Sequence, residues 1–143
     1  MRTGRGFTLI EVLVVVLILS VLAGIVGVSV WGHLSTGRQA AARVQIKTFK
    51  MALNSYRADS GIYPTQEQGL NALCRKPEQP PTPVRYPAEG YLDSRSPPLD
   101  PWGREYLYLM PGRSNMPFEV ISYGADGEPG GEGEAQDISS SDL

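Results

Sequence analysis

The stretch "FTLIEVLVVVLILSVLAGIVGVSVW" at Phe7–Trp31 decides the fold of the first part of this chain. Residues 12–31 carry no charge, and as a helix they would span roughly 30 Å, the thickness of a bilayer's hydrocarbon core. Glu11 interrupts the apolar run, and a carboxylate at that depth costs about 2.5–3.5 kcal/mol. The pattern predicts a membrane helix in which Glu11 has a partner, or else a segment that stays out of the bilayer.

Two other interpretations of this stretch are open. A cleaved secretory signal would use Arg2 and Arg5 as its basic end and the small residues near Ala23 as its cleavage site. Cleavage there would leave an exposed apolar start, "GIVGVSVW", which disfavours it. A buried core helix is disfavoured because no second apolar segment of that length follows. The short polar head and the large polar remainder favour an N-inside membrane helix.

The stretch "RGFTLIEVLVVVLILSVLAGIV" resembles the N-terminal signal of type IV pilins and pseudopilins. In that family a short basic leader ends in glycine, the next residue is usually Phe, and Glu stands fifth after cleavage. These positions are Gly6, Phe7 and Glu11 here. The resemblance implies cleavage after Gly6 by a prepilin peptidase, N-methylation of Phe7, and neutralisation of a neighbouring subunit's amine by Glu11. Opposite charges are costly alone in a low-dielectric bundle and tolerable as a pair.

Apolar residues continue past the first stretch at spacings of three and four, which predicts one long helix from about Phe7 to Ser60. Gly61 is a plausible stop signal for this helix. The predicted apolar face of the second half consists of Leu34, Ala41, Val44, Ile46, Phe49, Ala52, Leu53 and Tyr56.

The remaining residues predict a small head with an antiparallel sheet. Thr65 and Gln68 fit a capping box, which predicts a short helix over 66–74. A proline-rich loop follows, and "DPWG" at 100–103 reads as a turn. Alternation predicts strands over 104–110 and 118–124. The predicted fold is α+β and pilin-like, a long helix packed on a small antiparallel sheet, with a leader (1–6), a hydrophobic membrane and assembly helix (7–31), its amphipathic continuation (32–60) and a globular head (61–143).

Three later blocks extend the resemblance over nearly the whole chain: "YPTQEQGLNAL", "YLDSRSPPLDPWGREYLYLMPG" and "VISYGADGEPGGEGEAQDI". Their order and spacing are similar to those of the major pseudopilin family of type II secretion systems. The resemblance implies a subunit that polymerises into a periplasmic pseudopilus driving protein secretion. Its implied partners are further copies, other pseudopilins, the inner-membrane assembly platform, the prepilin peptidase and the membrane. Its implied location is the bacterial inner membrane, single-pass with the head in the periplasm, and then the pseudopilus.

Charge is unevenly distributed along the chain. Residues 1–60 hold seven Lys or Arg and two acids, whereas residues 61–143 hold six and thirteen. The basic residues lie on a helix that continues from an anchor, so the pattern does not suggest nucleic acid. The last twenty residues hold six acids and no base, with several glycines. A solvated acidic tail is one interpretation of this segment.

A cation-binding loop is the other interpretation. A hard cation takes six to eight oxygens, some of them main-chain carbonyls, and glycine lets the backbone turn those carbonyls inward. The loop is not a calcium helix-loop-helix, because Gly130 occupies a ligand position. The family resemblance implies one Ca²⁺, held by the carboxylates of Asp126 and Asp137 and by carbonyls at Tyr123 and Ser139.

No catalytic constellation is visible, because the single His and the single Cys lie far apart in sequence and no phosphate or zinc motif occurs. The sequence therefore predicts a structural assembly subunit and not an enzyme. The alternatives are a minor pseudopilin or type IV pilin subunit, and a membrane-anchored calcium-binding domain that does not polymerise. Pilins commonly close a C-terminal disulfide loop, which Cys74 alone cannot form.

Overall fold

The computed structural model describes residues 8–143, except for the side chains of residues 23–34. It divides into two compact units, Met1–Thr36 and Gly37–Leu143. The predicted cleavage and methylation residues, Gly6 and Phe7, lie outside the described residues.

Helix α1 covers Leu9–Ser60 and ends at the predicted residue. In the first unit, the described apolar side chains of α1, at residues 9–22, are exposed to solvent. Every large apolar residue from Leu9 to Leu22 is at least 45% exposed, and Leu9 itself is 84% exposed. A continuous apolar surface of this kind marks an interaction site.

A membrane-spanning helix needs about 20 predominantly apolar residues. Among the residues that the structure describes, no helix is both long and apolar enough to cross a bilayer. The predicted span, residues 12–31, includes side chains that lie outside the described part.

The second half of α1 packs on the head in the second unit. The side chains of Ala42, Ile46, Phe49, Leu53 and Tyr56 are fully buried along one face, at spacings of three and four. The prediction was wrong for Ala41 and Val44, which are exposed. The position of Val44 around the helix axis explains its exposure. At 100° per residue, Val44 lies about 200° from Ile46, on the opposite face of the helix.

Three short strands form the antiparallel sheet, in the order β1 (Leu107–Leu109), β2 (Glu119–Ser122), β3 (Ile138–Ser139). Leu107 pairs with Ile121, and Ile121 pairs with Ser139. Both predicted strands are present, although they are shorter than predicted. The third strand was not predicted, because a two-residue segment carries no readable alternation. Every residue of the central strand β2 is buried.

The other elements are short 3₁₀ helices: η1 (Leu70–Leu73), η2 (Arg113–Asn115), η3 (Gly133–Ala135) and η4 (Ser140–Asp142). The predicted capping box is present. The Thr65 N–H donates to Oε1 of Gln68 over 3.1 Å, and the Gln68 N–H donates to Oγ1 of Thr65 over 3.2 Å. The helix predicted over 66–74 was wrong in extent. Gly69, with a positive φ of 56°, breaks the turn and leaves only η1.

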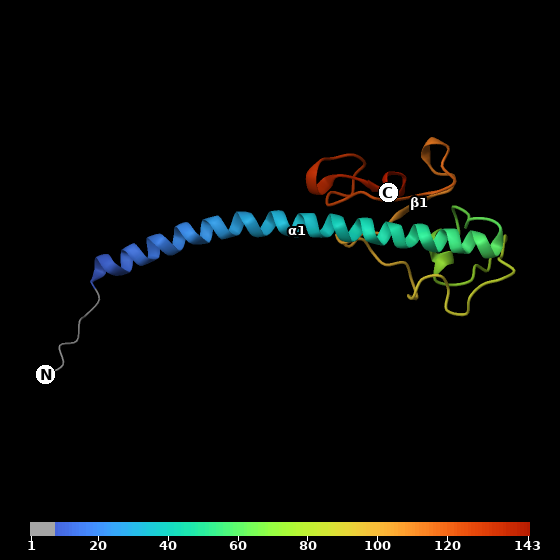
Figure 1. Ribbon diagram of the computed structural model, residues 1–143, viewed down its shortest axis with the longest axis horizontal. Coiled ribbons are helices and arrows are strands. Elements are labelled where there is room, and N and C mark those ends of the chain that lie inside the picture. The colour runs from blue at the N-terminus through green and yellow to red at the C-terminus, as the bar shows by residue number, and fades with distance from the viewer. Residues whose placement is uncertain (1–7) are drawn as a thin grey trace. The chain divides into compact units, whose positions relative to one another are not determined.

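Aromatic side chains join the helix to the head. The rings of Phe49 and Tyr106 meet edge to face with centroids 5.1 Å apart, and those of Tyr56 and Tyr91 have centroids 5.5 Å apart. Within the second unit, Figure 1 shows the C-terminal residues and the proline-rich residues drawn on opposite sides of the helix. The core joins the buried face of α1 to the strands on either side of the acidic loop. It therefore fixes where that loop begins and ends.

Candidate functional site

Glu11 lies at the start of α1, where it forms a capping box with Thr8. The Glu11 N–H donates to Oγ1 of Thr8 over 3.3 Å, and the Thr8 N–H approaches Oε2 of Glu11 at 3.5 Å. Sequence reasoning missed this pairing, although "TLIE" has the spacing of a capping box. The carboxylate of Glu11 is exposed, so the local contacts leave it accessible to a second partner.

The acidic loop runs from the end of β2 to the start of β3, so the sheet holds both of its ends. The Ala125 N–H donates to the carbonyl of Glu134 over 3.0 Å, which folds the loop back on itself. Gly124 lies so close to this return that a Cβ there would be 2.8 Å from the Glu134 carbonyl oxygen. The Tyr123 carbonyl accepts from the Gly127 N–H over 3.3 Å, closing a turn around Asp126.

The two predicted carboxylates have different surroundings. Asp126 is exposed, and its Oδ1 accepts from the Glu128 N–H over 3.2 Å. Asp137 is half-buried, and its Oδ2 accepts from the Gly130 N–H over 3.0 Å. Oδ1 of Asp137 is buried and has no hydrogen-bond partner among the residues that the structure describes. A buried carboxylate oxygen without a partner is costly, and a cation would satisfy it.

The predicted donor set of the loop combines carboxylate and main-chain carbonyl oxygens. No group of three or more Asp, Glu, His or Cys side chains among the described residues is placed to hold a metal. The predicted ligands comprise only two carboxylates together with carbonyls of Tyr123 and Ser139. That composition fits Ca²⁺, which accepts backbone carbonyls and irregular geometry.

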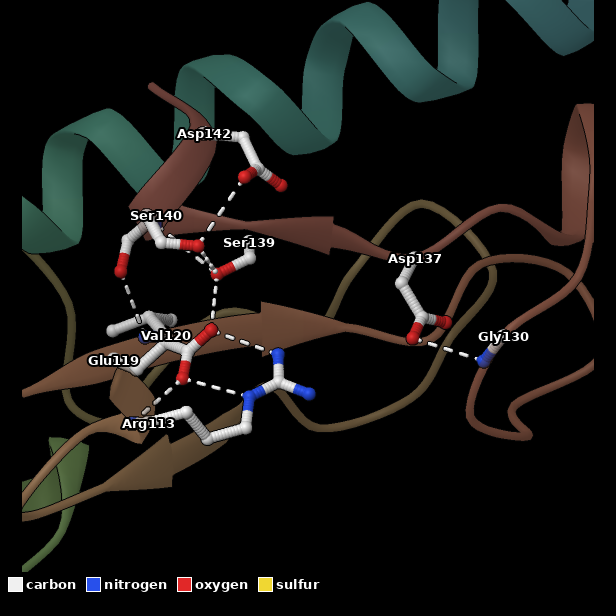
Figure 2. A network of polar contacts seen from close by, with 9 residues as sticks. Arg113, Glu119, Val120, Gly130, Asp137, Ser139, Ser140 and Asp142 are labelled. Carbon is white, nitrogen blue, oxygen red and sulfur yellow. Dashed lines mark hydrogen bonds and ion pairs between the residues drawn. The ribbon is translucent and has the colours of Figure 1, made fainter.

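Ser139 connects the loop to an ion pair between the buried Glu119 and the half-exposed Arg113 (Figure 2). Its hydroxyl donates to Oε1 of Glu119 over 2.6 Å. The guanidinium of Arg113 donates to both carboxylate oxygens of Glu119, at 2.8 and 2.9 Å, and the Arg113 N–H donates to Oε2 at 3.1 Å. These bonds lower the pKa of Glu119 to about 2, chiefly through Arg113 and against the effect of burial. Sequence reasoning missed this pair, because alternation along a strand does not show that a Glu faces the core.

Further polar contacts fix the residues after β3. The Val120 N–H donates to Oγ of Ser140 over 3.0 Å, and Nζ of Lys50 donates to the carbonyls of Ser140 and Leu143 over 3.3 and 2.6 Å. Figure 2 shows Val120 and Ser140 next to the Glu119 pair, with Asp137 where the chain enters β3. The strand that follows Asp137 is therefore tied to both the sheet and the helix.

The buried carboxylate of Asp100 anchors the start of the loop, at the end of β2. Asp100 is 5% exposed, and its Oδ2 accepts from the Ser122 hydroxyl over 2.6 Å. Its Oδ1 accepts from the N–H groups of Trp102 and Arg104 at 3.0 and 2.8 Å. The turn predicted at 100–103 is present, and it braces the last residue of β2, directly before the loop. Its contact with Ser122 was not predicted, because twenty-two residues separate the partners.

Comparison with known families gives two matches that together cover most of the chain. Residues 29–141 match the family model "Type II secretion system (T2SS), protein G". Residues 1–27 match the "Prokaryotic N-terminal methylation motif", which includes Gly6, Phe7 and Glu11.

Similar proteins include the type II secretion system core protein G of three bacteria. The Vibrio cholerae protein is 44% identical, over 96% of this chain and 92% of its own length. The Pseudomonas aeruginosa protein is 42% identical, over 96% and 94%. The Dickeya chrysanthemi protein is 44% identical, over 90% and 82%. The crystal structure of the major pseudopilin of enterohaemorrhagic Escherichia coli superposes with a TM-score of 0.66 at 35% identity, covering 79% of this chain and 94% of that one.

The fold and the leader motif define a class, the pilin-like structural subunits with an N-terminal methylation motif. Within that class the chain belongs to the type II secretion system protein G family, and it is a major pseudopilin. The predicted α+β fold is confirmed by the same structural similarity. The family consists of structural subunits, so the prediction that the chain is not an enzyme is confirmed as well.

Proposed function

We propose that this major pseudopilin polymerises with further copies into a periplasmic pseudopilus that drives type II protein secretion. The observation that supports this most is the apolar surface of α1 over residues 9–22, where every large side chain is at least 45% exposed. Such a surface is stable in water only when it is covered. Neighbouring subunits would cover it in a filament, and lipid would cover it before assembly.

The proposed location follows from this surface and from the leader. Before assembly the subunit sits in the bacterial inner membrane as a single-pass protein, with its head in the periplasm. A prepilin peptidase removes the leader, and the inner-membrane platform extracts the subunit and adds it to the filament, together with other pseudopilins. The methylation motif over residues 1–27 supports the processing step.

Glu11 is proposed to pair with the methylated amine of Phe7 on a neighbouring subunit. The capping box with Thr8 uses the carboxylate only weakly, at 3.5 Å. The pairing would neutralise two charges that the apolar bundle cannot solvate, and it would favour one axial stagger between subunits.

The alternative function is that of a membrane-anchored calcium-binding domain that does not polymerise.

Replacing Glu11 with valine is expected to abolish filament formation while membrane insertion stays equal or improves. The reason is that valine removes the insertion cost of the carboxylate but also removes the partner of the amine. Filaments would be counted by electron microscopy and secretion measured in a complemented strain. Glu11→Gln is the matched control, because glutamine keeps the capping box without the charge. Normal assembly of the Gln variant would assign the role of Glu11 to capping and contradict the pairing.

Replacing Gly6 with leucine is expected to leave an uncleaved precursor in the membrane. A peptidase that works at the membrane face needs a small residue beside the bond it cuts. N-terminal sequencing or mass spectrometry would show Met1 retained, in place of a methylated Phe7. Gly4→Leu, two positions earlier in the leader, is the control and should be cleaved. Cleavage of the Gly6→Leu precursor directly before Phe7 would rule out this site.

The acidic loop is proposed to bind one Ca²⁺ through Asp126, Asp137 and the carbonyls of Tyr123 and Ser139. The unpartnered Oδ1 of Asp137 supports this proposal, as does the closed turn that contains Asp126. When bound, the ion would supply a charge that joins the two ends of the loop. The loop would then be ordered for contacts between subunits in the filament.

A further inference from the structure

The side chain of Arg104 binds main-chain carbonyls in the first turn of the acidic loop. Its Nη1 donates to the carbonyl of Gly124 over 2.9 Å and to that of Ala125 over 2.8 Å. These two residues lie between Tyr123 and Asp126, which are two of the proposed calcium ligands. One guanidinium group therefore holds both residues of the segment that separates those ligands.

The backbone of the loop is shaped around this arginine. Gly127, with a φ of 73°, lies against the side chain so closely that a Cβ there would be 2.5 Å from Nε of Arg104 and 2.9 Å from Cζ. Only glycine permits that approach at that backbone angle. The turn thus contacts Arg104 through two carbonyls on one side and through Gly127 on the other.

The main chain of Arg104 is hydrogen-bonded to the buried Asp100. Its main-chain N–H donates to Oδ1 of Asp100, and the Asp100 N–H donates to the Arg104 carbonyl, both over 2.8 Å. Asp100 is bonded to Ser122 at the end of β2. The arginine therefore projects from a rigid turn, and its position does not depend on a cation in the loop.

We propose that Arg104 is a positioning residue for the cation loop, one that fixes the turn of residues 123–127 before Ca²⁺ binds. The inference rests on the calcium site proposed above. Groups that orient metal ligands without touching the metal change affinity by about 10–100-fold when they are removed. The turn is rich in glycine, so its unrestrained form has much conformational entropy to lose on binding.

The positive charge of Arg104 would weaken calcium binding, whereas its positioning of the turn would strengthen it. A cationic side chain near the loop repels Ca²⁺, so removing it would tighten binding if charge were the main effect. The side chain is exposed, and at physiological ionic strength exposed charges are strongly screened. We therefore expect positioning to outweigh repulsion.

The test is calorimetric titration of Ca²⁺ into the full-length protein in a mild detergent, at about 0.15 M and about 0.5 M salt. Arg104→Met is expected to weaken calcium binding about tenfold at both salt concentrations. Arg85→Met is the matched control, since Arg85 is exposed and forms no side-chain hydrogen bond or ion pair within the described part of the chain. The calcium affinity of this variant should not change. Arg104→Gln provides a second variant if Arg104→Met does not fold, which circular dichroism would show.

The outcomes separate this inference from the calcium proposal. If the unaltered protein binds Ca²⁺ and the Arg104 variants bind it equally or more tightly, the positioning role is wrong and the calcium site stands. If the unaltered protein binds no Ca²⁺, both are wrong. A lower melting temperature in chelator with an unchanged dissociation constant would show that Arg104 only stabilises the fold, and would also overturn the inference.

Discussion

Replacing Arg113 with methionine is expected to lower the free energy of unfolding at pH 7 by about 2–3 kcal/mol. The change removes the bidentate partner of the Glu119 carboxylate. The side chain of Glu119 is only 2% exposed. Breaking a buried ion pair from one side costs more than losing the pair as a whole, because the remaining charge stays desolvated. The expected loss is smaller than for a fully buried pair, because the Arg113 side chain is 55% exposed and solvent partly screens its charge.

The effect should depend on pH in a direction set by Glu119. Its pKa in the folded protein is lowered from the ordinary value to about 2, so folding favours the ionised carboxylate. The stabilisation is complete above the pKa of the unfolded chain, near 4.5, and is lost as pH falls toward 2. The difference between the two proteins should therefore shrink steadily between pH 4.5 and pH 2.

Urea unfolding of the full-length protein in mild detergent, from about pH 2 to pH 7, would measure both predictions. Arg95→Met is the control, because Arg95 is exposed and forms no side-chain hydrogen bond or ion pair within the described residues. It should change stability by less than about 0.5 kcal/mol. A destabilisation by Arg113→Met that is the same at every pH would mean that Arg113 acts by packing, and the charge explanation would be wrong.

Removing Ca²⁺ with a chelator is expected to lower the melting temperature on the order of 10 °C, relative to calcium at about a hundredfold excess over its dissociation constant. Binding to the folded state alone stabilises it by about 2.7 kcal/mol at that excess. In a domain of this size each kcal/mol shifts the melting temperature by about 4–8 °C. Asp137→Ala should remove the response, because Oδ1 of Asp137 is the buried oxygen that lacks a partner.

Variants within the same loop provide the controls for this experiment. Asp126→Ala should reduce the calcium response, whereas Glu132→Ala should leave it nearly intact, since Glu132 is exposed and is not among the proposed ligands. Mg²⁺ should substitute poorly, because it demands octahedral geometry and retains its waters. Equal melting temperatures in calcium, magnesium and chelator would identify the loop as a solvated acidic tail.

Local patterns were sufficient to predict the long helix, its end at Ser60, the capping box at Thr65 and the positions of two strands. Each of these depends on residues within about four positions of one another, so spacing and residue type carry the signal. The resemblance of the leader predicted the wider class of pilins and pseudopilins, and the resemblance of three later blocks predicted the major pseudopilin family. The family comparisons confirmed both predictions. The loop residues were predicted as calcium ligands, and that remains a prediction.

Only the tertiary structure decided how the ends of the acidic loop are held. The pairs Ser122–Asp100, Ser139–Glu119 and Arg104–Gly124 join residues twenty or more positions apart. Nothing local distinguishes Glu119 as buried, because a strand shows its faces but not which of them the core covers. Strand β3 exists only because β2 offers an edge for two residues to pair with. Such contacts depend on chain closure across the whole head, and short-range spacing in a single sequence does not record that.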